Sequence, residues 1–196
     1  MKIFLSLENS EENRELTSLL KKLEQYEITD HFDSRYKTTV IVNGPLTQLS
    51  EMLLKDHALT EKISEILLVG GSDSYGDVTP VAEKNIYADP ESAQHVFLSG
   101  IPIVMFGLNI TRQLDNKGLI PLIFLLEPSV FCTEECGVLV ETKGHITRGM
   151  TVTDLYSDKQ FDNHYVQIIK EIDLPKYQQF VRSLKQKTGF ETGQND

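Results

Sequence analysis

Short apolar runs alternate with amphipathic stretches over the first two thirds of the chain. Four of these runs have the length and the aliphatic content of buried strands, namely Lys2–Leu7, Thr38–Val42, Glu65–Val69 and Ile101–Phe106. The stretch Glu12–Tyr26 instead carries leucines at three- and four-residue spacing, which predicts an amphipathic helix. Strands that alternate with helices indicate βαβ units, so we expect a mostly parallel sheet with helices on both faces.

Capping and turn residues predict where other helices begin and end. Pro45 follows an Asn-Gly break and is expected at the first position of the next helix. Asp89 and Pro90 predict the N-cap and the first position of a further helix, which Gly100 is expected to end. The apolar run Leu119–Leu126 predicts another helix, stopped by the proline that follows it.

The last third of the chain has a different pattern. The segment Val138–Val152 predicts an antiparallel hairpin with Lys143 and Gly144 at its turn. A further strand over His164–Asp173 and a closing amphipathic helix over Leu174–Gly189 follow. The whole pattern therefore predicts an α/β fold, in which a mostly parallel sheet flanked by helices is completed by a C-terminal β-hairpin.

Composition and charge narrow the class of protein. The chain has 196 residues, 40% hydrophobic and 24% charged, which predicts one globular domain over residues 1–190 and a frayed tail over 191–196. Its net charge of −10 would repel nucleic-acid phosphates and anionic membranes. No apolar run reaches membrane-spanning length, and carboxylates follow the short apolar N-terminus at once. We therefore expect a cytoplasmic protein without nucleic-acid or membrane partners.

Two cysteines form a C-x3-C motif at Cys132 and Cys136. A zinc site would require two further ligands, and the sequence has no CxxC or HxxxH motif to supply them. Because disulfides are rare in cytosolic proteins, we expect both cysteines to be free thiols.

A long polar stretch, Tyr75–Ala93, separates the third and fourth predicted strands. Most connections in compact domains are only a few residues long, so a stretch of this length needs an explanation. Three polar residues, Asp77, Glu83 and Asn85, are closely spaced within it. They are candidate ligand-binding residues, and the alternative is that they satisfy backbone amides of the loop itself.

Five sequence blocks, in order, resemble the inosine–uridine nucleoside hydrolase family. They are NGPLTQL, EILLVGG, YGDVTPVAEKNIYADPESA, GIPIVMFGLNIT and the pair EPSVF and TRGMTV, and the match extends from Val40 to about Leu184. The resemblance implies a nucleoside-hydrolase-like fold and hydrolysis of the N-glycosidic bond of nucleosides. It also implies a Ca²⁺ ion held by acidic residues at the carboxyl ends of parallel strands.

The same resemblance assigns the long polar stretch to the family's sugar-binding loop. Glu83 and Asn85 match the Glu and Asn that contact the sugar, and Lys84 replaces the family's aromatic residue between them. Asp77 stands where the family has Asn; an ionised Asp only accepts hydrogen bonds, so a sugar hydroxyl would have to donate to it. Asn43 occupies a position whose backbone carbonyl contacts the metal in the family. These four residues, Asn43, Asp77, Glu83 and Asn85, are the predicted ligand-binding set.

The family's metal-binding and catalytic motif is altered in this chain. Where the family has D-T-D-P-G-x-D-D, residues 6–13 run Ser-Leu-Glu-Asn-Ser-Glu-Glu-Asn. Glu8 and Glu12 keep carboxylates at two of the four acidic positions, and Asn13 replaces a metal-binding Asp with a neutral amide. Glu12 is therefore the candidate general base. The alternative is that these acidic residues simply favour the start of a helix.

Two further departures affect the expected chemistry. Two segments of the family are much shorter here, and the late His-Asp pair, which serves the leaving base and the metal, falls on Lys117 and Gly118. The chain keeps at most Glu8, the Asn13 amide and the Asn43 carbonyl from the family's metal cage. Because calcium affinity follows the number of carboxylates, we expect no metal and no other cofactor, although the family uses Ca²⁺.

These features favour a degenerate family member that has lost N-glycosidase activity. Such a protein would keep weak ribose or nucleoside binding, or it would act as an interaction module. The alternative is an active purine or pyrimidine ribonucleoside N-ribohydrolase with a rebuilt site. The shortened segments are also expected to uncover sheet edges and apolar surface, which predicts a homo-oligomer or pairing with a full-length homologue.

Overall fold

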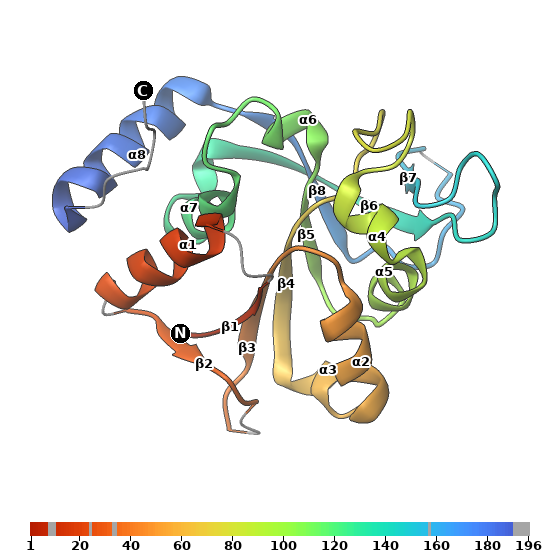
Figure 1. The fold of residues 1–196 in the computed structure, drawn as a ribbon, viewed down its shortest axis with the longest axis horizontal. Helices are drawn as coiled ribbons and strands as arrows, with labels where there is room; N and C mark the ends of the chain where they lie inside the picture. The colour runs from red at the N-terminus through yellow and green to blue at the C-terminus, as the bar shows by residue number, and fades with distance from the viewer. Residues whose placement is uncertain (8–10, 24, 33–34, 157, 190–196) are drawn as a thin grey trace.

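The computed structural model describes residues 1–7, 11–23, 25–32, 35–156 and 158–189 (Figure 1). At residues 6–7 and 11–13 it describes the backbone but not the side chains. The predicted frayed tail, residues 191–196, lies outside the described residues. The division into one domain over residues 1–190 stays a prediction.

Within the described residues, eight strands form one sheet. They are β1 (Lys2–Leu7), β2 (Glu27–Thr29), β3 (Thr38–Asn43), β4 (Ile63–Val69), β5 (Ile103–Phe106), β6 (Phe131–Val140), β7 (Thr151–Asp154) and β8 (Val166–Ile172). Their spatial order is β2-β1-β3-β4-β5-β8-β6-β7. The pairs from β2 to β8 are parallel, whereas β6 is antiparallel to both β8 and β7. The predicted mostly parallel sheet and C-terminal hairpin are therefore confirmed.

Helices cover both faces of this sheet. They are α1 (Glu11–Lys22), α2 (Thr47–Lys55), α3 (Leu59–Lys62), α4 (Lys84–Ala88), α5 (Pro90–Phe97), α6 (Leu108–Thr111), α7 (Ile120–Leu126) and α8 (Leu174–Thr188), with 3-10 turns η1 (Lys117–Leu119) and η2 (Pro128–Val130). Figure 1 shows α1, α7 and α8 on one side of the sheet and α2, α3 and α5 on the other. None of the described helices combines the length and the apolar character needed to cross a bilayer.

The central strands are buried on both faces, which explains their continuous apolar sequence. Along β3, Val40 and Val42 pack into the core beneath α2 and α5, while Ile41 packs into the core beneath α1 and α7. Successive side chains of a strand point to opposite faces, so a strand between two helical layers needs apolar residues at every position. The same alternation recurs in β4, where Leu67 and Leu68 enter opposite cores.

The predicted helix start holds at α5 and fails at α2, and α5 ends at Phe97, earlier than the end predicted at Gly100. Asp89 caps α5, because its carboxylate accepts a hydrogen bond from the Ser92 amide at 3.1 Å and Pro90 takes the first helical position. The predicted start of α2 at Pro45 is wrong, since the helix begins at Thr47. The turn formed by Gly44, with φ of 159°, and Pro45 carries the chain over the end of β3 before the helix starts.

Two other local predictions need correction. The hairpin of β6 and β7 has no tight turn at Lys143 and Gly144, because a long loop joins Val140 to Thr151. The Glu141 carboxylate holds this loop by accepting hydrogen bonds from the amides of Lys143 and Gly144 at 2.8 and 2.9 Å. The region between α1 and β3, for which the sequence predicts no strand, contains the short edge strand β2.

Candidate functional site

A pocket of about 200 Å³ lies where β3 and β4 end. Asn43 is the last residue of β3, and Val69 is the last residue of β4. Ten residues line the pocket: Asn43, Val69, Gly70, Asp77, Glu83, Lys84, Asn85, Leu108, Thr111 and Lys117. The carboxyl ends of parallel strands are the usual position of ligand sites in open α/β sheets. The structure thus brings all four predicted ligand-binding residues, Asn43, Asp77, Glu83 and Asn85, to one pocket.

Glu83 is the most buried charged residue of the pocket, with an exposed fraction of 6%. Its Oε2 accepts hydrogen bonds from the backbone amides of Gly71, Asn85 and Ile86 at 3.0, 2.9 and 3.1 Å. Glu83 is therefore the N-cap of α4, and it also ties that helix to the end of β4. Burial raises the pKa of its carboxyl above the ordinary value of 4.5, and these hydrogen bonds oppose the rise.

Two glycines after β4 make room for this carboxylate. A Cβ at Gly70 would lie 3.1 Å from Glu83 Oε2, which is tighter than an ordinary contact. Gly71 has φ of 76°, in the left-handed region that favours glycine, and a Cβ there would lie 2.7 Å from the Met105 sulfur. The Gly-Gly pair of the EILLVGG block therefore lets the backbone approach both Glu83 and the core.

The other two polar residues of the loop also bond to local backbone. Asn85 Nδ2 donates to the Val69 carbonyl at 2.9 Å, and Asp77 Oδ1 accepts from the Lys84 amide at 2.8 Å. Within the described residues, these contacts involve one polar atom of each side chain: Oδ1 of Asp77, Oε2 of Glu83 and Nδ2 of Asn85. These residues therefore bond to backbone groups, amides for Asp77 and Glu83 and the Val69 carbonyl for Asn85, and they also line a pocket.

The loop from Ser72 to Pro80 is held against the sheet at several points. The Ser72 amide donates to Thr151 Oγ1 at 2.8 Å, and the ammonium group of Lys170 lies 2.7 Å from Asp73 Oδ2. The guanidinium of Arg112 donates to the Gly76 carbonyl at 3.0 Å. The polar stretch is thus long because it folds into a wall of the pocket.

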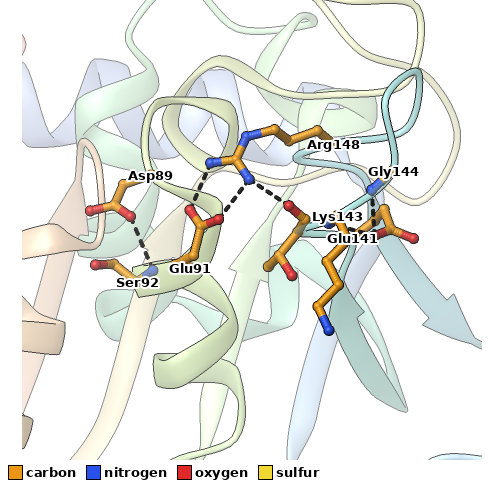
Figure 2. A network of polar contacts seen from close by, with 8 residues as sticks. Asp89, Glu91, Ser92, Glu141, Lys143, Gly144 and Arg148 are labelled. Carbon is orange, nitrogen blue, oxygen red and sulfur yellow. Dashed lines mark hydrogen bonds and ion pairs between the residues drawn. The ribbon is translucent and has the colours of Figure 1, made fainter.

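A second network fixes the start of α5 to the β6–β7 loop. The Arg148 guanidinium forms two hydrogen bonds with the Glu91 carboxylate, at 2.6 and 2.7 Å, and also donates to the Thr142 carbonyl (Figure 2). The hydrogen bonds from Arg148 lower the pKa of the exposed Glu91 carboxyl. Arg148 and Thr151 both belong to the TRGMTV block, so this block supports the loop beside α5 through Arg148 and the loop that forms the pocket wall through Thr151.

Several contributors to the site were not predicted from the sequence. Lys84 and Lys117 line the pocket, and Leu108 and Thr111 from α6 complete its wall. Leu108 and Thr111 lie in the GLNIT part of a recognised block, which was the available signal. The resemblance assigns the late His-Asp pair to positions 117 and 118, and in the structure Lys117 lines the pocket.

The segment that the resemblance identifies with the family's catalytic motif, residues 6–13, lies only partly within the described residues. Glu8 lies outside the described residues, and the side chains of Glu12 and Asn13 are not described. The backbone register nevertheless pairs Leu7, the last residue of β1, with Asn43. The chain therefore leaves β1 beside the pocket, and the roles assigned to Glu8 and Glu12 stay predictions.

The described residues do not provide a calcium site. They contain no group of three or more His, Cys, Asp or Glu side chains arranged to hold a metal ion. The pocket combines Asp77 and Glu83 with Lys84 and Lys117, and ammonium groups repel a divalent cation. Hard oxygen ligands in larger number are needed for tight calcium binding.

The two cysteines are free thiols, as predicted, and lie apart from the pocket residues. Cys132 is exposed, whereas Cys136 is buried in the core. Burial raises the pKa of the Cys136 thiol to about 12. A thiol that stays protonated at neutral pH is a poor nucleophile, so Cys136 has a packing role.

Comparison with known sequences points to one family. The profile described as inosine-uridine preferring nucleoside hydrolase matches residues 7–121. The pyrimidine-specific ribonucleoside hydrolase RihA of Shewanella oneidensis is 33% identical over 165 residues, covering 63% of this chain and 52% of the relative. RihA of Salmonella paratyphi A is 34% identical over 166 residues, covering 63% and 53%. The chain therefore spans about half the length of the curated relatives it matches.

Solved structures show the same fold. A purine-preferring ribonucleoside hydrolase from Gardnerella vaginalis superposes with a TM-score of 0.78 at 16% identity, over 97% of this chain and 99% of that chain. The inosine-uridine preferring nucleoside hydrolase from Bacillus anthracis gives a TM-score of 0.65 at 19% identity, over 92% and 67%. At these identities the likeness concerns the arrangement of the sheet and helices.

Proposed function

The chain belongs to the inosine-uridine preferring nucleoside hydrolase family, and from this we propose that its pocket binds the ribose of a nucleoside without cleaving the N-glycosidic bond. The observation that carries the proposal is the convergence of Asn43, Asp77, Glu83 and Asn85 on one pocket. The sequence alone predicts these four residues as a ligand-binding set, and they come from two distant segments.

The chemistry of the pocket suits a sugar. Carboxylate oxygens of Asp77 and Glu83 accept hydrogen bonds from hydroxyl groups, and the Asn85 amide can both donate and accept. Sites for drug-sized ligands typically have volumes of about 300–1,000 Å³. The pocket of about 200 Å³ is smaller, which favours a ligand of monosaccharide size over one that buries a sugar and a nucleobase together.

The proposed loss of hydrolysis rests on missing chemical groups. Cleavage of an N-glycosidic bond needs an activated water on one side and stabilisation of the leaving base on the other. Lys117 and Gly118 occupy the places of the family's His-Asp pair, and no histidine lies among the described residues that line the pocket. Removal of a general acid or base typically costs about 10²–10⁴-fold in rate.

An active N-ribohydrolase is the second candidate. The observation that favours it is the register of β1, which pairs Leu7 with Asn43 at the pocket, and α1, which includes Glu12, is the next element along the chain. Glu12 would then serve as the general base. The relatives named above are themselves described as ribonucleoside hydrolases, which also supports this candidate.

Calorimetric titration with ribose tests the binding proposal, with Asp77→Ala as the informative variant. Asp77 is exposed and contacts the Lys84 amide, so its loss should weaken ribose binding while the protein stays folded. Glu141→Ala is the matched control, because Glu141 also accepts loop amides but lies outside the pocket. Equal ribose affinity in both variants would contradict the proposal. No ribose binding by the unaltered protein would leave the interaction module as the better account.

We also propose that the chain self-associates in the cytoplasm, alone or with a longer homologue. In the described part of the chain, β2 and β7 are open edges of the sheet, and the apolar side chains of Ile146 and Tyr156 are both 79% exposed. Open edges and exposed apolar groups favour association. Sedimentation equilibrium should give a mass above the 22.2 kDa of one chain, and a monomer at tens of micromolar would contradict this proposal.

A further inference from the structure

Two lysines line the proposed ribose pocket, and neither has a role in the binding described so far. Lys84 is the first residue of α4 and is exposed at the pocket. Lys117 is the first residue of η1 and is half-buried. The two residues come from segments far apart in the sequence, so the fold, and not a local run of basic residues, brings both lysines to the lining of the same pocket.

In the described part of the chain, neither pocket lysine forms an ion pair. Other lysines do: Lys170 pairs with Asp73 at 2.7 Å, and Lys62 pairs with Asp56 at 3.5 Å. The sequence has 29 acidic and 19 basic residues, so acidic partners are abundant. Two unpaired ammonium groups at one pocket of such an acidic chain are therefore available to an anionic ligand.

We propose that the ligand of this pocket is a phosphorylated ribose, with the sugar hydroxyls toward Glu83 and Asn85 and the phosphate toward Lys84 and Lys117. The inference rests on the proposed ribose-binding function and names its ligand class. A phosphate carries a charge of about −1.5 to −2 at neutral pH, which two ammonium groups can balance. Lysine binds phosphate as a mobile point charge, so it does not need a rigid geometry.

The arrangement of charges fixes the orientation of the ligand. The carboxylates of Asp77 and Glu83 attract hydroxyl donors and repel a phosphate, so the phosphate must lie away from them. Glu83 is buried, whereas Lys84 is exposed, which places the strongly hydrated phosphate at the solvent side of the pocket. Because the net charge of −10 repels anions at long range, binding of a phosphate depends on these local cations.

The test is calorimetric titration with ribose 5-phosphate, ribose and inorganic phosphate. Ribose 5-phosphate should bind about tenfold more tightly than ribose, since exposed charge pairs contribute modestly and two act together. Inorganic phosphate alone should bind more weakly than ribose 5-phosphate. Inosine 5′-monophosphate compared with inosine then shows whether a complete nucleotide brings the same phosphate into the pocket.

Variants assign the effect to the two lysines. Lys117→Gln and Lys84→Gln should each reduce the preference for ribose 5-phosphate over ribose, and Lys117→Arg should retain it. Lys143→Gln, which removes an exposed lysine outside the pocket, is the matched control and should change nothing.

The outcomes separate this inference from the proposed function. Ribose that binds as tightly as ribose 5-phosphate would overturn the phosphate inference and leave ribose binding intact. Inorganic phosphate that binds as tightly as ribose 5-phosphate would reduce the site to an anion site and overturn the inference. If neither ribose nor ribose 5-phosphate binds, both proposals fail. A preference unchanged in Lys84→Gln and Lys117→Gln would likewise overturn the assignment.

Discussion

The family resemblance implies a site with two halves. One half is the polar loop between β4 and α5, and the other is the junction between β1 and α1. The loop keeps Glu83 and Asn85, and the structure places both at the pocket. The junction has lost every Asp of its motif, keeping Glu8 and Glu12 in part. By residue type, the resemblance therefore implies that the sugar-binding half is retained and the metal-binding half is not.

The contacts of the loop suggest why the two halves differ. Glu83 caps α4 and accepts the Gly71 amide, and Asn85 donates to the Val69 carbonyl. Residues with such structural roles are needed for folding even where a ligand is lost. A metal cage would have no comparable role in a protein that bound no metal, because clustered carboxylates repel one another. The presence of Glu83 and Asn85 therefore supports ligand binding only when variants separate their effect on stability from their effect on ligand affinity.

The largest expected effect comes from Glu83→Ala. Three backbone amides would lose their acceptor in a buried position, where an unsatisfied donor costs about 1–3 kcal/mol. We expect a total loss of about 3 kcal/mol in the free energy of unfolding, since some amides will find water. Urea denaturation measures the loss. Glu141→Ala, which removes a more exposed amide acceptor, should cost less, and an equal cost would mean that burial of Glu83 is not decisive.

The next effect concerns the glycine that lets the loop approach the core. Gly71 and Gly100 have similar φ values of 76° and 80°, but a Cβ would meet Met105 at Gly71 and nothing within 4 Å at Gly100. We expect Gly100→Ala to cost about 1 kcal/mol from backbone strain and Gly71→Ala about 2–3 kcal/mol, because the buried Met105 must also move. Thermal unfolding of both variants gives the difference. Equal costs would show that packing at Gly71 is unimportant.

A smaller effect is the pH dependence that Glu83 contributes. Its folded-state pKa is raised above 4.5, so its stabilising contribution is present below that pH and is lost as pH rises through the folded-state pKa. Relative to Glu83→Gln, which cannot ionise, the unaltered protein should therefore become less stable as pH increases above 4.5. Denaturant titrations across this range provide the measurement. A relative stability that grows with pH would mean that the amide hydrogen bonds outweigh burial.

Regular periodicity explains what could be predicted of the fold. Strands such as β3 carry an unbroken apolar run, Val40–Val42, because both faces are covered, and that pattern is visible without a structure. The short strand β2 has no such pattern, with one buried residue in three, and its pairing with β1 depends on the tertiary fold. The loop between β6 and β7 was predicted as a tight turn because the sequence does not show that Arg148 reaches Glu91 on α5.

The candidate site was predictable where residue type and spacing carry the information. Glu83 and Asn85 lie two residues apart and match a family motif, so they could be found from the sequence. The pairing of Lys170 with Asp73 joins β8 to a loop nearly one hundred residues earlier, and no local pattern indicates it. The same holds for Lys117, whose position at the pocket follows from the packing of η1 and not from its neighbours in the sequence.

The central claim, that the retained half of the site binds ribose without hydrolysis, is tested most directly by assaying inosine and uridine cleavage with and without added Ca²⁺. The account predicts no cleavage above background in either condition, because the family resemblance implies that the leaving-group residues and most of the metal ligands are replaced. Turnover that depends on Ca²⁺, and that disappears in Glu12→Gln, would contradict it. That result would establish Glu12 as the general base of a working N-ribohydrolase.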